Sequence, residues 1–285
     1  MSASERAWPY TSNWDADIVD TFCHLNDVFR RLDHAGTFAE FRLKHRSTFP
    51  YNYGGCVANF TNPVAFERHD RWQALLAEDC VWGSFGCPPY YADEYSEGVE
   101  KCLRRVLGHD SAVAVGRIGL DYSESPLLTC KNQQKHALRR QLLLAAERRL
   151  PVVLYSRNAT FDIVKLFRET GLINHRIQLE GFCGEWPEAK FWLDTFPNLY
   201  LGLTPELALP CRGDLVKVAG KALLNRVLFE TAAPQCLPSA EARWLAGSHP
   251  GMVVHVPLEL SRILDLQVEE VAAIVRENTR RFYGI

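Results

Sequence analysis

Residues 112–155 decide the fold: AVAVGRI at Ala112–Ile118 is followed by KNQQKHALRRQLLLAAERR at Lys131–Arg149 and VVLY at Val152–Tyr155. The two short runs are rich in β-branched residues and mostly free of charge, which is typical of parallel strands buried on both faces. Between them, four apolar residues share one face of the expected helix: Leu138, Leu142, Ala145 and Ala146. The segment therefore predicts a strand, a crossover helix and a second, parallel strand.

The same alternation continues in both directions along the chain. The other strand candidates are Asp17–Thr21, Gly55–Asn59, Val81–Phe85, Ile177–Gly181, Leu199–Leu203 and Val227–Glu230. The last helix is expected to begin near Leu266, with Asp265 as its N-cap and Glu269 and Glu270 in its first turn. Strands that alternate with helices in this way predict an α/β protein with a (β/α)₈ TIM barrel. No glycine-rich phosphate motif follows the first strand, which argues against a dinucleotide-binding fold.

Length and composition favour one domain. The chain has 285 residues, of which 47% are hydrophobic, enough for one large core. We expect a single barrel domain over residues 1–285, with residues 1–15 as an N-terminal extension. The N-terminus lacks the apolar stretch of a signal peptide, and no run of about 18 apolar residues occurs. These features predict an intracellular protein, cytoplasmic or nuclear, without a membrane partner.

Charge and cysteine content narrow the partners and the redox chemistry. The net charge is −2, so an attraction to nucleic acid would need a local basic patch. One candidate patch is formed by Arg139, Arg140, Arg148 and Arg149, although solvated helix faces often carry such charges. The nine cysteines are scattered without a C-x-x-C pair, which indicates buried free thiols.

Several short motifs stand at the ends of the predicted strands, where a barrel carries its active site. They are VDTFCHL at Val19–Leu25, IGLDY at Ile118–Tyr122, SR at Ser156–Arg157, FETAAP at Phe229–Pro234 and the ending ENTRRFYGI. In this order they resemble the TatD family of metal-dependent deoxyribonucleases along essentially the whole chain. Two longer stretches, GTFAEFRLKHRSTFPYNYGGCVANFTNP and LLAEDCVWGSFGCPPYYADEYSE, resemble the animal subgroup called TatD-domain-containing protein two. The resemblance implies a barrel of the metallo-dependent hydrolase, amidohydrolase-like type.

The resemblance also implies a divalent metal such as Mg²⁺, Mn²⁺ or Zn²⁺, held by histidines and carboxylates, that hydrolyses phosphodiesters. The family patterns D-x-H-x-H, G-E-I-G-L-D-Y, H-C-F-x-G and E-T-D-A-P, together with a histidine before S-R, place the ligands on six positions. These positions hold Phe22, His24, Arg117, Tyr155, Glu180 and Ala232. In addition, the family pattern G-C-H-P-H reads GCPPY at Gly86–Tyr90 and has lost both imidazoles. Only His24 and Glu180 could bind a metal well, so we expect no metal cofactor.

Arg117 is the decisive substitution, because a guanidinium stays protonated at any working pH. At about 4 Å it would repel a divalent cation by roughly 8 kcal/mol at an effective dielectric constant of ~20. We therefore expect Arg117 to take the place of the metal and to pair with Glu180, with His24 or Asp121 alongside. If Gln178 took the strand-six position instead of Glu180, a metal site would still not be restored.

Three functions fit these residues. The favoured one is a pseudoenzyme, an inactive or strongly impaired deoxyribonuclease homologue that binds a phosphate or carboxylate ligand or a partner. The candidate binding residues are Arg117, Arg157, His24, Glu180 and Tyr90, and the candidate ligands are a phosphate-bearing small molecule or a nucleic-acid end. An unidentified protein partner is a further candidate.

The first alternative is a nuclease with residual activity on a single metal ion held by His24 and Glu180. The second is metal-free chemistry, with His24, Glu180 and Tyr155 as candidate catalytic acids or bases. Cys23 and Cys183 are expected to fill the core rather than to act as nucleophiles. Tyr90, Tyr91 and Tyr95 either form a rim that stacks a base or a partner side chain, or pack beneath their own loop.

Overall fold

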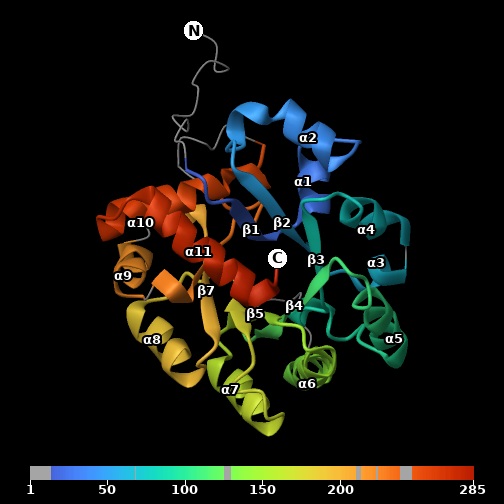
Figure 1. The fold of residues 1–285 in the computed structure, drawn as a ribbon. Coiled ribbons are helices and arrows are strands. Elements are labelled where there is room, and N and C mark those ends of the chain that lie inside the picture. The colour runs from blue at the N-terminus through green and yellow to red at the C-terminus, as the bar shows by residue number, and fades with distance from the viewer. Residues whose placement is uncertain (1–13, 68, 125–129, 210–212, 223, 238–245) are drawn as a thin grey trace.

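The computed structural model describes residues 14–67, 69–124, 130–209, 213–222, 224–237 and 246–285. In these ranges, parallel strands follow one another in sequence order around a nearly closed barrel, with helices outside it (Figure 1). The strands are β1 (Ile18–Cys23), β2 (Tyr53–Phe60), β3 (Val81–Phe85), β4 (Ala112–Asp121), β5 (Val152–Arg157), β6 (Ile177–Leu179), β7 (Leu199–Leu203) and β8 (Val227–Phe229). The predicted (β/α)₈ barrel is confirmed.

The helices connect successive strands on the outside of the barrel. They are α1 (Leu25–Arg31), α2 (Phe38–Lys44), α3 (Pro63–Glu67), α4 (His69–Leu76), α5 (Glu97–Val106), α6 (Lys131–Arg148), α7 (Thr160–Glu169), α8 (Trp186–Thr195), α9 (Gly213–Lys221), α10 (His255–Leu264) and α11 (Val268–Tyr283). As predicted, Leu138, Leu142 and Ala145 on α6 are buried. Of the predicted N-terminal extension, residues 1–13 lie outside the described ranges, whereas Trp14 is buried in the core.

The first and last strands meet at a short seam. The Ala232 N–H donates to the Phe22 carbonyl at 2.9 Å, and the His24 N–H donates to the Ala233 carbonyl at 2.8 Å. These two bonds bring the end of β1 beside the segment that follows β8. Residues 22–24 and 232–233 therefore share one side of the barrel opening.

The helix ends correct one prediction. Asp265 is not the N-cap of the last helix, because it ends α10 with a left-handed φ of 53°, and Gln267 is the N-cap of α11. Aspartate is one of the few non-glycine residues that tolerate this conformation, so a helix stop competes with a helix start at such a position.

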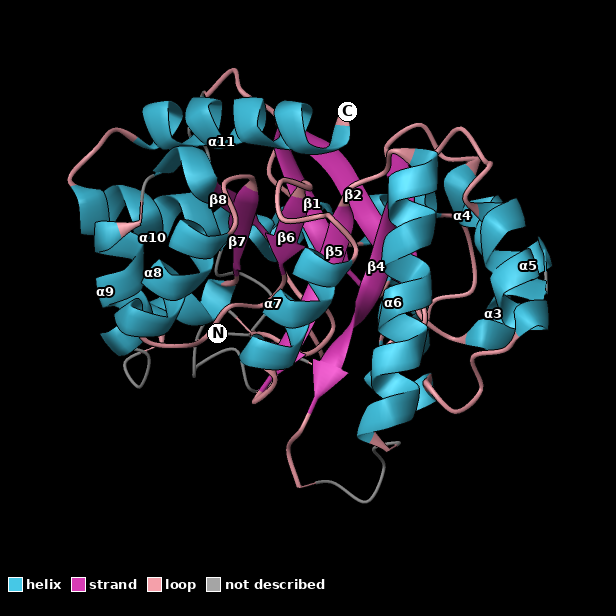
Figure 2. Cartoon of the chain, turned by 90° about the horizontal axis from the view of Figure 1, so that it is seen from below, coloured by secondary structure: helices cyan, strands magenta, loops and turns pink. Residues whose placement is uncertain are grey.

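The last helix, α11, lies across the N-terminal ends of the strands, as Figure 2 shows. Its final turn sends Phe282 and Tyr283 into the interior. The Tyr283 hydroxyl donates to Oε1 of Gln178, and Nε2 of Gln178 donates to the Thr21 hydroxyl at 3.0 Å. This helix therefore covers one end of the barrel, and the opposite end, where the strands finish, is the barrel mouth.

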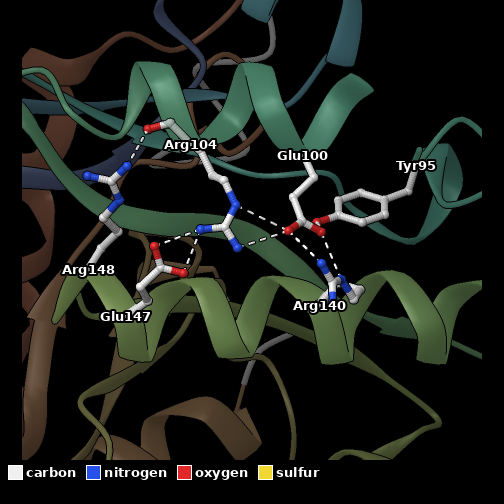
Figure 3. A network of polar contacts seen from close by, with 6 residues as sticks. All are labelled: Tyr95, Glu100, Arg104, Arg140, Glu147 and Arg148. Carbon is white, nitrogen blue, oxygen red and sulfur yellow. Dashed lines mark hydrogen bonds and ion pairs between the residues drawn. The ribbon is translucent and has the colours of Figure 1, made fainter. Parts of the chain in front are cut away.

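Two of the four arginines of the predicted basic patch, Arg139 and Arg140, form ion pairs with carboxylates of neighbouring helices. Figure 3 shows Glu100 of α5 accepting hydrogen bonds from Arg104 at 3.0 Å and Arg140 at 2.7 Å, and from the Tyr95 hydroxyl at 3.1 Å. Arg139 pairs with Glu169 of α7. These arginines tie α6 to its neighbours, which is the behaviour of a solvated helix face. No helix in the described ranges has the length and apolar character needed to cross a membrane.

Candidate functional site

The barrel mouth brings together most of the residues singled out in the sequence. Phe22 and His24 come from the end of β1, Arg117 from β4, Tyr155 from β5 and Glu180 from the turn after β6. Of these side chains, Arg117 and Glu180 are the charged ones, and both are largely buried.

Arg117 and Glu180 form the ion pair that their complementary charges predict. Nε of Arg117 lies 2.7 Å from Oε1 of Glu180, and the two side chains are 17% and 6% exposed. The Nε–H does not point along this line, so the contact is an ion pair and not a directed hydrogen bond. Burial raises the pKa of Glu180, and the charge of Arg117 opposes that shift. The pair neutralises two charges that neither residue could bury alone.

Aromatic rings surround the guanidinium. Its central carbon lies 3.9 Å from the centroid of the Tyr155 ring and 6.0 Å from that of Phe22, so the cation faces two π-systems. The Tyr155 hydroxyl donates to Oδ2 of Asp121 at 3.0 Å. Asp121 therefore holds Tyr155 in place below Arg117 and does not take part in the Arg117–Glu180 pair.

His24 is uncharged in this setting. Burial and, after it, the positive charge of Arg117 lower the pKa of His24 to about 4, although a hydrogen bond with the backbone of Asn59 partly opposes them. Its ring meets Phe22 edge to face, with centroids 5.2 Å apart. A neutral imidazole beside a permanent cation can accept a proton or a hydrogen bond, but it adds no positive charge to the mouth.

Two buried carboxyl groups beneath the mouth were missed in the sequence. Glu230 accepts a hydrogen bond from the Gly181 N–H at 2.7 Å and another from Gln178. Burial raises the pKa of Glu230 well above its usual range, and the nearby charges of Glu180 and Asp20 raise it further. Burial also raises the pKa of Asp20 to about 7, against hydrogen bonds from Thr231. The sequence signal that could have identified Glu230 as a site residue is its position directly after the apolar strand β8, in FETAAP at Phe229–Pro234.

Gln178 and Glu180, the two candidates for the strand-six position, lie in different parts of the barrel. Gln178 points into the barrel core, where it joins Thr21, Glu230 and Tyr283. Glu180 follows the last strand residue, in a turn that continues through Gly181 at φ 54°. Glu180 is therefore the residue that reaches the mouth.

The remaining predicted residues lie at the rim. Burial alone would lower the pKa of Arg117. The negative charge of Glu180 and, after it, the interaction with Tyr90 outweigh burial and raise the pKa of Arg117 above its usual value. Arg157 is exposed, and together with Arg117 it opposes the rise in the pKa of Tyr155 that burial causes. Tyr90 and Tyr91 pack against each other with centroids 4.9 Å apart. Tyr95 instead donates to Glu100, so Tyr90 is the tyrosine of this loop that interacts with Arg117.

The cysteine predictions need a correction. Cys23 is buried as expected, but Cys183 is exposed, and so is Cys130. Cys183 follows the turn at Gly181, which carries the chain out of the barrel, so it does not fill the core. All cysteines in the described ranges are free thiols, and Cys211 lies outside those ranges.

Metal ligation is not apparent in the geometry. Within the described ranges, no three His, Cys, Asp or Glu side chains converge in a way that could hold an ion. The expectation of a site without metal stays a prediction.

Parallel strands in a nearly closed ring, with ionisable side chains at the strand ends, define the class of (β/α)₈ barrel proteins. Residues 19–284 match the family described as TatD related DNase, so the chain belongs to that family.

Three relatives illustrate the family. The human "3'-5' RNA nuclease TATDN2" is 35% identical over 269 residues, which are 94% of this chain and 35% of the relative. The chain thus spans about a third of the length of that relative. "Uncharacterized metal-dependent hydrolase YabD" of Bacillus subtilis is 27% identical, covering 78% of this chain and 86% of the relative. "3'-5' ssDNA/RNA exonuclease TatD" of Pantoea ananatis is 28% identical, covering 81% and 88%.

Solved structures share the fold. The TatD homologue YJJV from Escherichia coli superposes with a TM-score of 0.78 at 22% identity, covering 94% of this chain and 98% of the other. An uncharacterized amidohydrolase from Saccharomyces cerevisiae gives a TM-score of 0.74 at 15% identity, covering 94% and 100%. The barrel fold expected from the sequence is therefore confirmed, with TatD and amidohydrolase barrels among its structural neighbours. The names of these relatives describe nucleases and a metal-dependent hydrolase, which supports a DNase-like hydrolase function in the family.

Proposed function

We propose that this TatD-family barrel binds an anionic group, a phosphate or a carboxylate, at its mouth and does not carry out metal-dependent hydrolysis. The observation that carries the proposal is the buried guanidinium of Arg117, paired with Glu180 and stacked on Tyr155. A guanidinium fork binds carboxylates and phosphates through two parallel hydrogen bonds, and it cannot lose its charge.

The donor set around Arg117 does not fit the metal that the family uses. The family patterns place six ligands here, and this chain supplies His24 and Glu180 as the only good donors among them. Glu180 already neutralises Arg117 at 2.7 Å. A dication would have to displace that contact and would then lie beside an uncompensated cation. The electrostatic balance at this mouth favours an anion.

The backbone at Ala232 supports the loss of a ligand rather than a different architecture. Ala232 has a left-handed φ of 48°, a conformation that aspartate and asparagine tolerate better than alanine does. The family pattern has aspartate at this position. The frame of the family site is therefore retained around a changed set of side chains.

An incoming anion would meet two cations of different accessibility. Arg157 is exposed at the rim, and Arg117 lies deeper, with Glu180 as its present partner. An anion that reaches Arg117 has to compete with the Glu180 carboxylate. This competition favours multiply charged phosphates over single carboxylates, because their attraction to both arginines is larger.

The first test is the melting temperature with and without inorganic phosphate or dAMP. We expect an increase of a few degrees for the wild type and for Arg148→Ala, an exposed matched control on α6, but none for Arg117→Ala. Arg117→Ala leaves Glu180 buried without a partner, so the double variant Arg117→Ala/Glu180→Ala should be measured beside it. Equal stabilisation of wild type and double variant would refute the role of Arg117.

The second test concerns metal and nuclease activity. Purified protein, loaded with Mn²⁺ or Zn²⁺ and dialysed, should hold far less than one ion per chain and should not digest single-stranded DNA or RNA. A variant with the family residues restored, Phe22→His, Arg117→Glu, Tyr155→His, Glu180→His and Ala232→Asp, should bind metal stoichiometrically. Stoichiometric metal in the wild type, with nuclease activity that disappears in His24→Ala, would instead establish the alternative of a single-metal nuclease.

A further inference from the structure

The outer face formed by α6, α7 and α8 carries an unusual aromatic pair. Phe161, in the first turn of α7, is 82% exposed, and Phe191, in α8, is 38% exposed. Their rings lie 6.1 Å apart, edge to face. The three helices are neighbours around the barrel, on the side away from α2 (Figure 1). Exposing an aromatic ring to water is unfavourable, and a partner that covers the ring removes this cost.

An open depression of about 320 Å³ lies between the two rings and is lined by Phe161, Val164, Lys165, Arg168, Glu169 and Phe191. A second depression, of about 370 Å³, continues it toward α6 and shares Lys165 and Glu169 with the first. Together they form a groove, which we call the α6–α8 groove.

The charges along the α6–α8 groove are unequal. Four cations line it, Lys135, Arg139, Lys165 and Arg168, against the two carboxylates Asp162 and Glu169. Glu169 is paired with Arg139 and lies 3.9 Å from Lys165, and Asp162 lies 3.5 Å from Lys135. No ion pair of Arg168 is found in the described part of the chain. The groove thus has a positive excess beside its apolar centre, in a chain whose net charge is −2.

We propose that the α6–α8 groove is a docking surface for an acidic protein segment that inserts one large apolar side chain between Phe161 and Phe191. Aromatic and arginine side chains at the centre of an interface supply most of its binding energy. An anchor residue would cover the two rings, and aspartate or glutamate beside it would pair with Arg168 and Lys165.

Single-stranded nucleic acid fits this surface less well. Its affinity comes chiefly from many phosphate contacts, and proteins that bind it combine stacking with a continuous basic track. In the α6–α8 groove, the carboxylates of Asp162 and Glu169 already occupy Lys135 and Arg139 and interrupt such a track. The apolar depression with few free cations matches a protein segment.

The experiment is the selection of peptides that bind the intact chain from a phage-displayed library of random 16-residue sequences. The selected peptides are then synthesised, and their affinities are measured. We expect the selected peptides to combine Asp or Glu with a Leu, Phe or Trp anchor. Their affinity should fall at least tenfold for Phe161→Ser and severalfold for Arg168→Glu. It should be unchanged for two matched controls on α2, Leu43→Ser and Lys44→Glu; Leu43 is 67% exposed.

Three outcomes would overturn the proposal. One is a failure to select any peptide. Another is that the selected peptides lack acidic residues or bind Phe161→Ser as tightly as the wild type. The third is that a labelled oligothymidylate of 16 nucleotides binds the wild type but binds Phe161→Ser more weakly. That result would assign the surface to nucleic acid. Arg117→Ala should not change peptide binding, so this result does not depend on the ligand proposed at the mouth.

Discussion

Buried ionisable residues in this chain are neutralised in different ways. Arg117 keeps its charge and carries its counterion, Glu180, with it. His249, 2% exposed, stays neutral instead. Its Nδ1 accepts the Gly251 N–H at 3.1 Å, and Nε2 lies 2.8 Å from the Thr48 hydroxyl, which itself donates to the His45 carbonyl. This network fixes the proton on Nε2 and leaves no place for a second one.

The protonation of His249 should therefore make the fold sensitive to acid. Burial and, after it, the neighbouring histidines His45 and His255 lower the pKa of His249 to about 3. Below an unfolded pKa of about 6.5, the unfolded chain binds a proton that the native state refuses, so stability falls as the pH falls. The expected loss from this residue is up to about 1.4 kcal/mol per pH unit between about 6.5 and 3.

The check is urea unfolding of the wild type and His249→Gln at pH 7 and pH 5. The variant should start less stable, because it loses its hydrogen bonds, but its free energy of unfolding should fall less between the two pH values. Asp20 acts in the opposite direction, since its raised pKa of about 7 favours the native state in acid. Equal pH slopes for both proteins would contradict the neutral His249.

At the residue scale, the sequence could predict Arg117 and Glu180 as a pair, because two opposite charge changes fell on positions that the family brings together. It could not predict that Tyr155 stacks on the guanidinium, since that depends on the hydrogen bond to Asp121. Glu230 was missed because a pattern of apolar residues does not show which way the last side chain of a strand points.

The elements are held together by polar contacts as well as by the core. Helices α5 and α6 meet through Glu100, whose side chain is 9% exposed and is shared by Arg104 and Arg140. Glu147 belongs to the same network, as Figure 3 shows. Its side chain is 52% exposed. The two carboxylates have similar partners but different access to water, so they form a natural comparison.

Glu100→Gln should destabilise the protein by about 1–3 kcal/mol, because a buried carboxylate that serves two arginines is replaced by a neutral amide. Glu147→Gln should cost less than about 1 kcal/mol, because water screens an exposed pair. Urea denaturation midpoints of the two variants measure the difference. If both variants unfolded at the same urea concentration, burial of Glu100 would not matter to the α5–α6 contact.

Strand positions were predictable because apolar runs mark them directly, but their ends were not. β4 continues to Asp121 and β5 to Arg157, past the predicted ends, because the Tyr122 N–H bonds to the Arg157 carbonyl at 2.9 Å and extends the ladder. β6 stops earlier, at Leu179, where the chain turns toward Gly181. Strand ends depend on neighbouring strands, which a local pattern does not show.

For the molecule as a whole, alternation of strands and helices was enough to predict the barrel. The sequence could not predict that α11 covers the N-terminal end of the barrel. The apolar stripe of this helix shows only that one of its faces is buried. Val271, Ala272 and Val275 are indeed buried. The position of the helix follows from its last turn, which inserts Phe282 and Tyr283 among the strands.

Tyr283→Phe tests this closure. The change removes the hydroxyl that donates to Oε1 of Gln178 and leaves a buried carbonyl without that donor. We expect the free energy of unfolding to fall by about 1–3 kcal/mol. Tyr51→Phe is the matched control, because Tyr51 is 61% exposed and should change the urea midpoint little. An unchanged midpoint for Tyr283→Phe would show that the hydroxyl does not hold α11 in place.

In the described residues, α11 covers the N-terminal ends of the strands and buried side chains fill the barrel interior, so a ligand can approach Arg117 only from the mouth. Whatever settles on Arg117 enters between the strand ends and has to leave by the same route. A ligand therefore cannot pass through the barrel from one end to the other. A partner seated across the rim would control arrival and escape together, so residence time, rather than affinity alone, would be the quantity that such a partner changes.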